Sequence, residues 1–200
     1  MAKYFRADLS KVKATNRGGR LHSAVCNEKD LVNGTLGYLG GFVAGSTEIR
    51  EFVTPTAELV KGKLPVIVMK PEIVYDETKR LLGDFINIKG KAFPVVPLEE
   101  FDNIDLSADF LDLTGKANGE GGVAPAVAVG DIFVLQANNV AGTQLKYSAQ
   151  APGADVAGFY FKVIDIRNSH IANVLYDDGS ANAVLFPQAY KIVALELVVL

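Results

Sequence analysis

The side chains best suited to chemistry are one thiol and two imidazoles. Cys26 is the only cysteine, and His22 and His170 are the only histidines. His22 precedes Cys26 by four residues, so Cys26 could act as a nucleophile with His22 as its base. A lone cysteine is, however, more often a small buried apolar side chain. Neither histidine has a second ligand at a metal-binding spacing. The sequence therefore predicts no metal site, no cofactor and no internal disulfide.

Carboxylates form two groups, and paired carboxylates can act as an acid and a base or hold a divalent cation. The first group consists of Glu72, Asp76, Glu77 and, further on, Asp84, with Tyr75 among them. A simpler interpretation makes Asp76 the cap of a short helix over 76–82, with the other charges solvated. The second group alternates with apolar residues, which predicts a solvent-facing strand edge whose charges deter aggregation. It consists of Glu99, Glu100, Asp102, Asp105, Asp109 and Asp112.

Catalytic signatures are missing from the chain. It contains no Gly-x-Ser-x-Gly elbow, phosphate loop or dinucleotide fingerprint, and its glycines lack the strand-to-helix context of those motifs. The residues therefore identify no catalytic site, and they disfavour nucleotide chemistry. The enzymatic alternative is a small β-barrel hydrolase with a raised carboxyl pKa at Glu72, Asp76 or Glu77.

Short segments rich in β-branched and aromatic residues predict the elements of the fold. Strands are expected over 64–69, 132–136, 159–166 and 190–200, with a hairpin at Asp178-Gly179 between 171–176 and 183–186. The apolar run 192–200 predicts a buried or centrally paired last strand. Paired glycines such as Gly40-Gly41 predict turns, and 115–128 and 149–157 predict long loops. The fold class expected is mostly β, a β-barrel or sandwich with long loops, minimal helix and an extended N-terminal arm.

Composition and charge separate the N-terminus from the rest. The chain has 200 residues, 49% of them hydrophobic and 22% charged, which is typical of a folded protein. Its net charge is −3, but residues 1–20 carry +5 and the remainder −8. We therefore expect a basic arm over 1–20 that meets an acidic surface, and a β-rich domain over 21–200 with a candidate subdomain boundary near residue 100. The basic residues of the arm are Lys3, Arg6, Lys11, Lys13, Arg17 and Arg20.

The negative net charge argues against direct binding of nucleic acid, and no stretch reaches the ~18 apolar residues of a membrane span. No signal-peptide pattern opens the chain, which predicts synthesis and retention in the cytosol unless the protein leaves inside something larger.

A succession of short motifs resembles a known group of proteins. These motifs are NGTLGYL at 33–39, EFVTPT at 51–56, KPEIVYDE at 70–77, LGDF at 82–85 and GKAF at 90–93. In order and spacing they resemble structural proteins from the head-gene region of tailed bacteriophages, described as capsid decoration or cement proteins, over roughly residues 30–140. The resemblance implies a virion protein on the outer capsid surface that is made in the host cytoplasm. It also implies binding to the major capsid protein, a homo-oligomer with a trimer favoured, and no enzymatic activity.

In such a protein, the N-terminal arm would bind the capsid. Its six basic residues would contact acidic patches of the capsid, and its backbone would add a strand to an exposed sheet edge. The alternative from the residues is a host-surface or carbohydrate-binding module of a fibre or tail. Exposed aromatic rings would serve that alternative, although the chain has no tryptophan and core positions explain the rings better. The aromatic residues concerned are Tyr38, Phe42, Tyr147, Phe159 and Tyr160.

Overall fold

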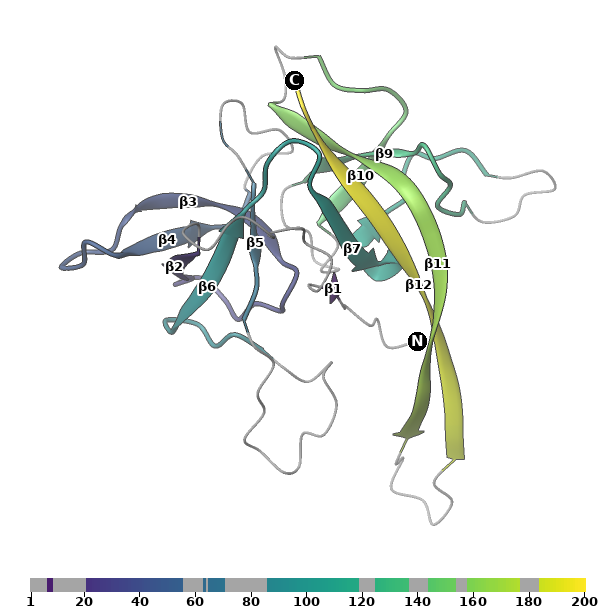
Figure 1. The fold of residues 1–200 in the computed structure, drawn as a ribbon, viewed down its shortest axis with the longest axis horizontal. Helices are drawn as coiled ribbons and strands as arrows, with labels where there is room; N and C mark the ends of the chain where they lie inside the picture. The colour runs from purple at the N-terminus through teal and green to yellow at the C-terminus, as the bar shows by residue number, and fades with distance from the viewer. Residues whose placement is uncertain are drawn as a thin grey trace.

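The computed structural model describes residues 7–8, 21–55, 63, 65–70, 86–118, 125–136, 144–153, 158–176 and 184–200, with the backbone alone over 7–8, 169–176 and 184–190. These residues form an all-β structure, as predicted, in which a closed barrel lies beside a curled sheet (Figure 1). The one helix in these ranges is a short 3₁₀ turn at Ala108–Phe110, which agrees with the expectation of minimal helix.

The first half of the chain forms the barrel. Its strands are β2 (His22–Val25), β3 (Leu36–Phe42), β4 (Ile49–Val53), β5 (Val66–Val68) and β6 (Ala92–Pro97), in the closed order β2-β4-β3-β5-β6. β5 confirms the strand predicted over 64–69. Phe52 and Phe93 fill the barrel interior and meet edge to face, with ring centroids 5.6 Å apart. Burial of these large aromatic side chains adds apolar contacts inside the barrel.

Glycines let β3 pass close to β4. A Cβ atom on Gly37 would lie 2.5 Å from Cζ of Phe52 and 2.7 Å from the carbonyl oxygen of Val53, so only glycine fits there. Gly40 and Gly41 were expected to form a turn, and this prediction is wrong because both lie inside β3. The pairing of β3 with β4 shifts register between Leu39 and Phe42, so the glycine pair forms a bulge rather than a turn.

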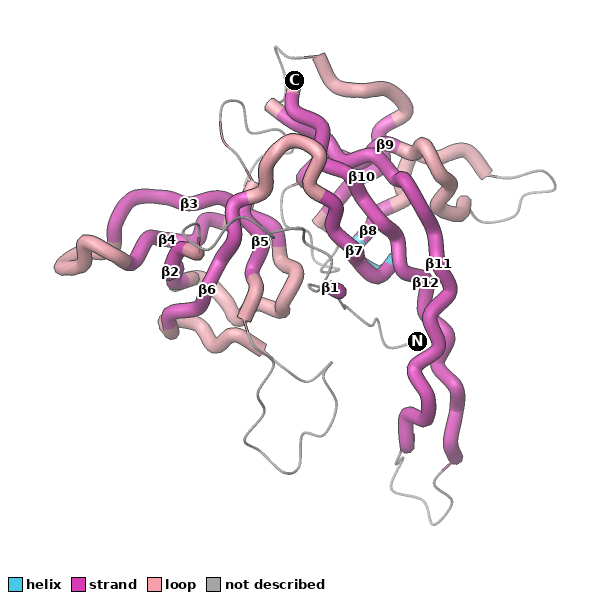
Figure 2. The backbone as a smooth tube through the Cα atoms, in the orientation of Figure 1, coloured by secondary structure: helices cyan, strands magenta, loops and turns pink. Residues whose placement is uncertain are grey.

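The second half of the chain, with one two-residue strand from the N-terminal region, builds the sheet. Its strands are β1 (Ala7–Asp8), β7 (Asn103–Ser107), β8 (Leu111–Asp112), β9 (Ile132–Leu135), β10 (Leu145–Ser148), β11 (Phe159–Tyr176) and β12 (Val184–Val199). They lie in the order β1-β7-β12-β11-β9-β10-β8, with β10 and β8 parallel and the other neighbours antiparallel (Figure 2). Strands predicted over 132–136, 159–166 and 190–200 are confirmed by β9, β11 and β12.

The last strand is central, as predicted. β12 lies between β7 and β11, and Val193, Leu195 and Leu197 are fully buried on it. β11 and β12 also form the expected hairpin, since Tyr176 pairs with Val184 at its far end. The Asp178-Gly179 turn itself lies outside the described residues, as does the short helix predicted over 76–82.

One apolar core joins the barrel to the sheet. Leu36, Ile67 and Leu98 of the barrel half belong to the same buried cluster as Phe133 and Phe161 of the sheet. The chain passes from one to the other between Pro97 and Asn103, close to the change in sequence character near residue 100. Because the cluster is continuous, the two parts form a single packed body.

The solvent-facing edge predicted over 99–112 is wrong at two positions. Asp105 is buried because β7 packs on both faces and lies between β1 and β12, and Asp102 is buried in the turn just before β7. An Arg167 side chain from β11 reaches Asp105, and the carboxylate of Asp102 accepts a hydrogen bond from the backbone N–H of Glu99 at 2.6 Å. Both carboxylates therefore organise the fold instead of protecting an edge.

Candidate interaction surface

The structure separates the two groups of the candidate thiol pair. Cys26 is buried in the barrel core, whereas His22 is exposed at the start of β2. Four residues of extended chain place their Cα atoms about 13 Å apart, which is too far for a hydrogen bond. This pair cannot act as a nucleophile and base. The side chain of His170 lies outside the described part of the structure.

Several other sequence candidates also lie outside the described residues. They are the arm residues Lys3, Arg6, Lys11, Lys13, Arg17 and Arg20, and the first acidic group with Glu72, Tyr75, Asp76, Glu77 and Asp84. Residues 7–8 of the arm are described as β1, whose Ala7 pairs with Leu106 of β7. Within the described ranges, no group of three or more His, Cys, Asp or Glu side chains is placed to hold a metal ion.

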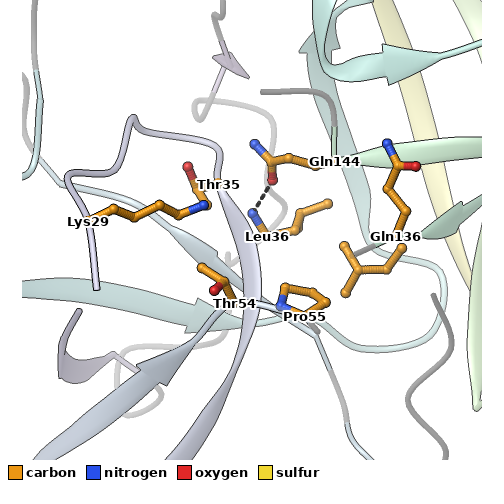
Figure 3. A pocket seen from close by; sticks show the side chains of 8 residues that line it. Lys29, Thr35, Leu36, Thr54, Pro55, Gln136 and Gln144 are labelled. Atoms are coloured by element: carbon orange, nitrogen blue, oxygen red, sulfur yellow. Dashed lines mark hydrogen bonds between the residues drawn. The ribbon is translucent and has the colours of Figure 1, made fainter. Parts of the chain in front are cut away.

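A small cleft lies at the seam between barrel and sheet (Figure 3). It is lined by Lys29, Thr35, Leu36, Thr54, Pro55, Leu135, Gln136 and Gln144. The side-chain oxygen of Gln144 accepts a hydrogen bond from the backbone N–H of Leu36 at 2.5 Å, which ties β3 to the sheet. Burial lowers the pKa of Lys29, although the charges of Cys26 and Glu28 oppose this effect. With a volume of about 20 Å³, the cleft has room for a water molecule.

The most prominent feature of the molecule is a two-stranded ribbon. β12 pairs with β7 as far as Ile192, and β11 pairs with β9 only at Phe161 and Lys162. From Asn168 opposite Lys191 to Tyr176 opposite Val184, the two strands pair with each other and with no other described strand. Figures 1 and 2 show this ribbon leaving the body of the molecule. The ribbon contains nine residues of β11, from Asn168 to Tyr176, which corresponds to a length of about 30 Å.

An ion pair braces the base of the ribbon. Nη2 of Arg167 donates to both carboxylate oxygens of Asp105, at 2.8 and 2.7 Å, and Nε of Arg167 lies 3.1 Å from a carboxylate oxygen of Asp165. Asp105 belongs to β7 and Arg167 to β11, so this contact crosses over β12. The brace therefore links β7 to β11 across β12, at the place where the sheet ends and the ribbon begins.

The aromatic residues do not form a stacking platform for sugars. Tyr38 and Phe159 are buried and Tyr147 packs edge to face on Phe133, in agreement with core positions. Tyr160 is half-buried. Phe42 is 53% exposed, and its ring is covered by the guanidinium of Arg50 at 4.4 Å. Among the side chains that the structure describes, the most exposed aromatic one is that of Phe101, a residue that no sequence motif pointed to.

Within the described ranges, no helix has the length and apolar character needed to cross a membrane. Comparison of the chain with protein-family models, with curated proteins and with solved structures finds no match.

Proposed function

We propose that this chain is a virion structural protein of a tailed bacteriophage, which decorates the outer surface of the head and stabilises contacts between major capsid proteins. The observation that carries the proposal is the β11–β12 ribbon. An isolated two-stranded ribbon is at best marginally stable in water, because it has no second layer to cover its apolar side chains. A ribbon of this length is therefore best explained as an element that docks on another protein.

The residues of the ribbon support docking on an apolar surface. Apart from Lys191 at its base, the ribbon has no Asp, Glu, Lys or Arg over 168–176 and 184–191. Val174 pairs with Phe186, and the next pair is Leu175 with Leu185. Consecutive residues of a strand belong to opposite faces, so apolar residues fall on both faces of the ribbon. Apolar residues on both faces suit a ribbon that docks on an apolar surface.

The resemblance over residues 30–140 supplies the identity of the partner in this proposal, since it points to the head of a tailed phage. The single packed body, the basic arm and the ribbon together suit a protein that adds contacts between neighbouring shell subunits. Each contact is modest, but many copies repeat it around the shell, and multivalent attachment raises the total stabilisation. We also propose a homo-oligomer on the shell, with a trimer favoured, no direct contact with nucleic acid and no enzymatic activity.

Cosedimentation with phage shells assembled without this protein tests the proposal. A ribbon-shortened variant lacks 170–189 and joins Ser169 to Tyr190, which are paired neighbours, through an Asn-Gly turn. The full protein is expected to bind the shells saturably and to raise their disruption temperature. The shortened variant should unfold at a similar temperature but bind much more weakly, and Phe42→Asn on the barrel should bind normally. The proposal would be overturned if the full protein did not cosediment with the shells.

A further inference from the structure

Phe101 occupies a backbone conformation that suits it poorly. Its φ angle is +67°, and it is the only non-glycine residue with positive φ in the described ranges. It is the third residue of a four-residue turn from Glu99 to Asp102, in which the N–H of Asp102 donates to the carbonyl of Glu99 at 3.0 Å. Positive φ at the third position defines a turn that favours glycine or asparagine, and a bulky side chain is strained there.

The surrounding structure imposes this conformation. The N–H of Phe101 donates to the carbonyl of Leu197, and the N–H of Leu197 donates to the carbonyl of Asp102, both at 2.9 Å. The buried carboxylate of Asp102 also accepts a hydrogen bond from the N–H of Glu99, which closes the turn. The backbone of the turn is thus fixed to β12 at two points. The ring of Phe101 takes little part in this arrangement, because the residue is 67% exposed.

For folding alone, glycine or asparagine would serve better than phenylalanine at this position. Phenylalanine adds backbone strain and leaves a large apolar ring in water. Strain that persists at an exposed residue points to a function. A ring on a fixed turn also loses little conformational freedom when it binds, and buried aromatic side chains dominate the energy of protein interfaces.

We propose that Phe101 is the anchor of a second contact with the shell, where its ring enters an apolar socket rimmed by Lys or Arg side chains. The basic rim is inferred from charge complementarity. Exposed Glu100 precedes Phe101, so the turn presents a carboxylate beside the ring. This inference rests on the proposed function and extends it.

The position of Phe101 relative to the ribbon indicates how the protein would act. The Phe101 turn is hydrogen-bonded to Leu197, near the C-terminal end of β12. The far end of the ribbon lies at Val184, the first residue of the same strand. Leu197 is the thirteenth residue after Val184, and this length of extended strand spans about 40 Å along β12. Figure 1 shows β12 running from the far end of the ribbon to the C-terminus, and Val184 begins this strand whereas Leu197 lies near its end. Contacts so far apart can be made with two different shell subunits, which is what a clamp requires.

The test compares Phe101→Asn with Phe42→Asn, which removes an exposed ring from the barrel instead. Phe101→Asn is expected to unfold at the same temperature as the unmodified protein or higher, and to bind shells at least tenfold more weakly. Phe42→Asn should bind as the unmodified protein does. Glu100→Lys should also weaken binding, because its new charge would face the basic rim.

The outcomes separate the two proposals. If the unmodified protein binds shells and Phe101→Asn binds equally well, the anchor is refuted while the decoration role stands. A lower unfolding temperature for Phe101→Asn would also refute it, since the ring would then contribute to the fold. If the unmodified protein does not bind shells, the proposed function fails and the anchor fails with it.

Discussion

The brace at the base of the ribbon gives the sharpest prediction about stability. Arg167→Met removes the guanidinium from Asp105 but keeps much of the aliphatic volume of the side chain. Asp105 is 3% exposed, so its carboxylate would be left buried without this cation. Breaking a fully buried pair in this way costs about 3–5 kcal/mol.

The geometry of Arg167 reduces that figure. The side chain of Arg167 is 37% exposed, so water already screens part of the interaction and can hydrate the site when the arginine is absent. We therefore expect a loss of about 1.5–3 kcal/mol in the free energy of unfolding. For a chain of this size, that loss lowers Tm by roughly 3–12 °C.

The assay is urea unfolding followed by far-ultraviolet circular dichroism, with thermal unfolding alongside. Asp165→Ala is the matched control, because the carboxylate of Asp165 is 56% exposed and its removal should change stability by less than about 1 kcal/mol. The double variant Asp105→Leu, Arg167→Met should recover part of the loss, since no buried charge is then left without a partner. The reasoning is refuted if Arg167→Met is as stable as the unmodified protein.

Three further predictions concern the barrel and its seam with the sheet. Gly37→Ala should lower the free energy of unfolding by about 1–3 kcal/mol, because its Cβ would overlap the β4 backbone, whereas Gly41→Ala, which faces open space, should be nearly neutral in the same urea titration. Gln144→Leu should lower the free energy of unfolding by about 1–3 kcal/mol, because the N–H of Leu36 loses its acceptor. A variant as stable as the unmodified protein would contradict the role of this hydrogen bond. Lys29 has a lowered pKa in the folded state, so its charged form opposes folding, and this penalty fades as pH rises through the folded pKa towards 10.5. Lys29→Met should accordingly be more stable than the unmodified protein at pH 7, with the difference shrinking at high pH, and a difference independent of pH would refute this account.

Local sequence patterns were enough to predict the fold class and the central elements. The apolar run over 192–200 led to a central last strand because burial on both faces leaves a continuous apolar signature. The hairpin of β11 and β12 followed from its turn dipeptide and the apolar runs beside it. The predicted strand over 159–166 was too short, however, since the polar residues from Arg167 to His170 break the apolar pattern although the strand continues through them.

Features that depend on distant partners could not be predicted. Alternation over 99–112 cannot reveal that Arg167, 62 residues away, neutralises a buried Asp105. Barrel closure rests on the parallel pairing of β2 with β4, for which neither strand carries a local signal. Phe101 offered no signal beyond an apolar residue among acidic ones, because its positive φ comes from hydrogen bonds to β12. The basic arm and the first acidic group remain predictions.

Electron cryomicroscopy of phage shells incubated with the protein tests the central claim most directly. The account predicts added density on the outer surface, in which the β11–β12 ribbon contacts one shell subunit and the Phe101 turn contacts its neighbour. Shells without added density after incubation at saturating protein would contradict the decoration role. Added density that leaves both the ribbon and Phe101 in solvent would contradict the proposed mode of attachment.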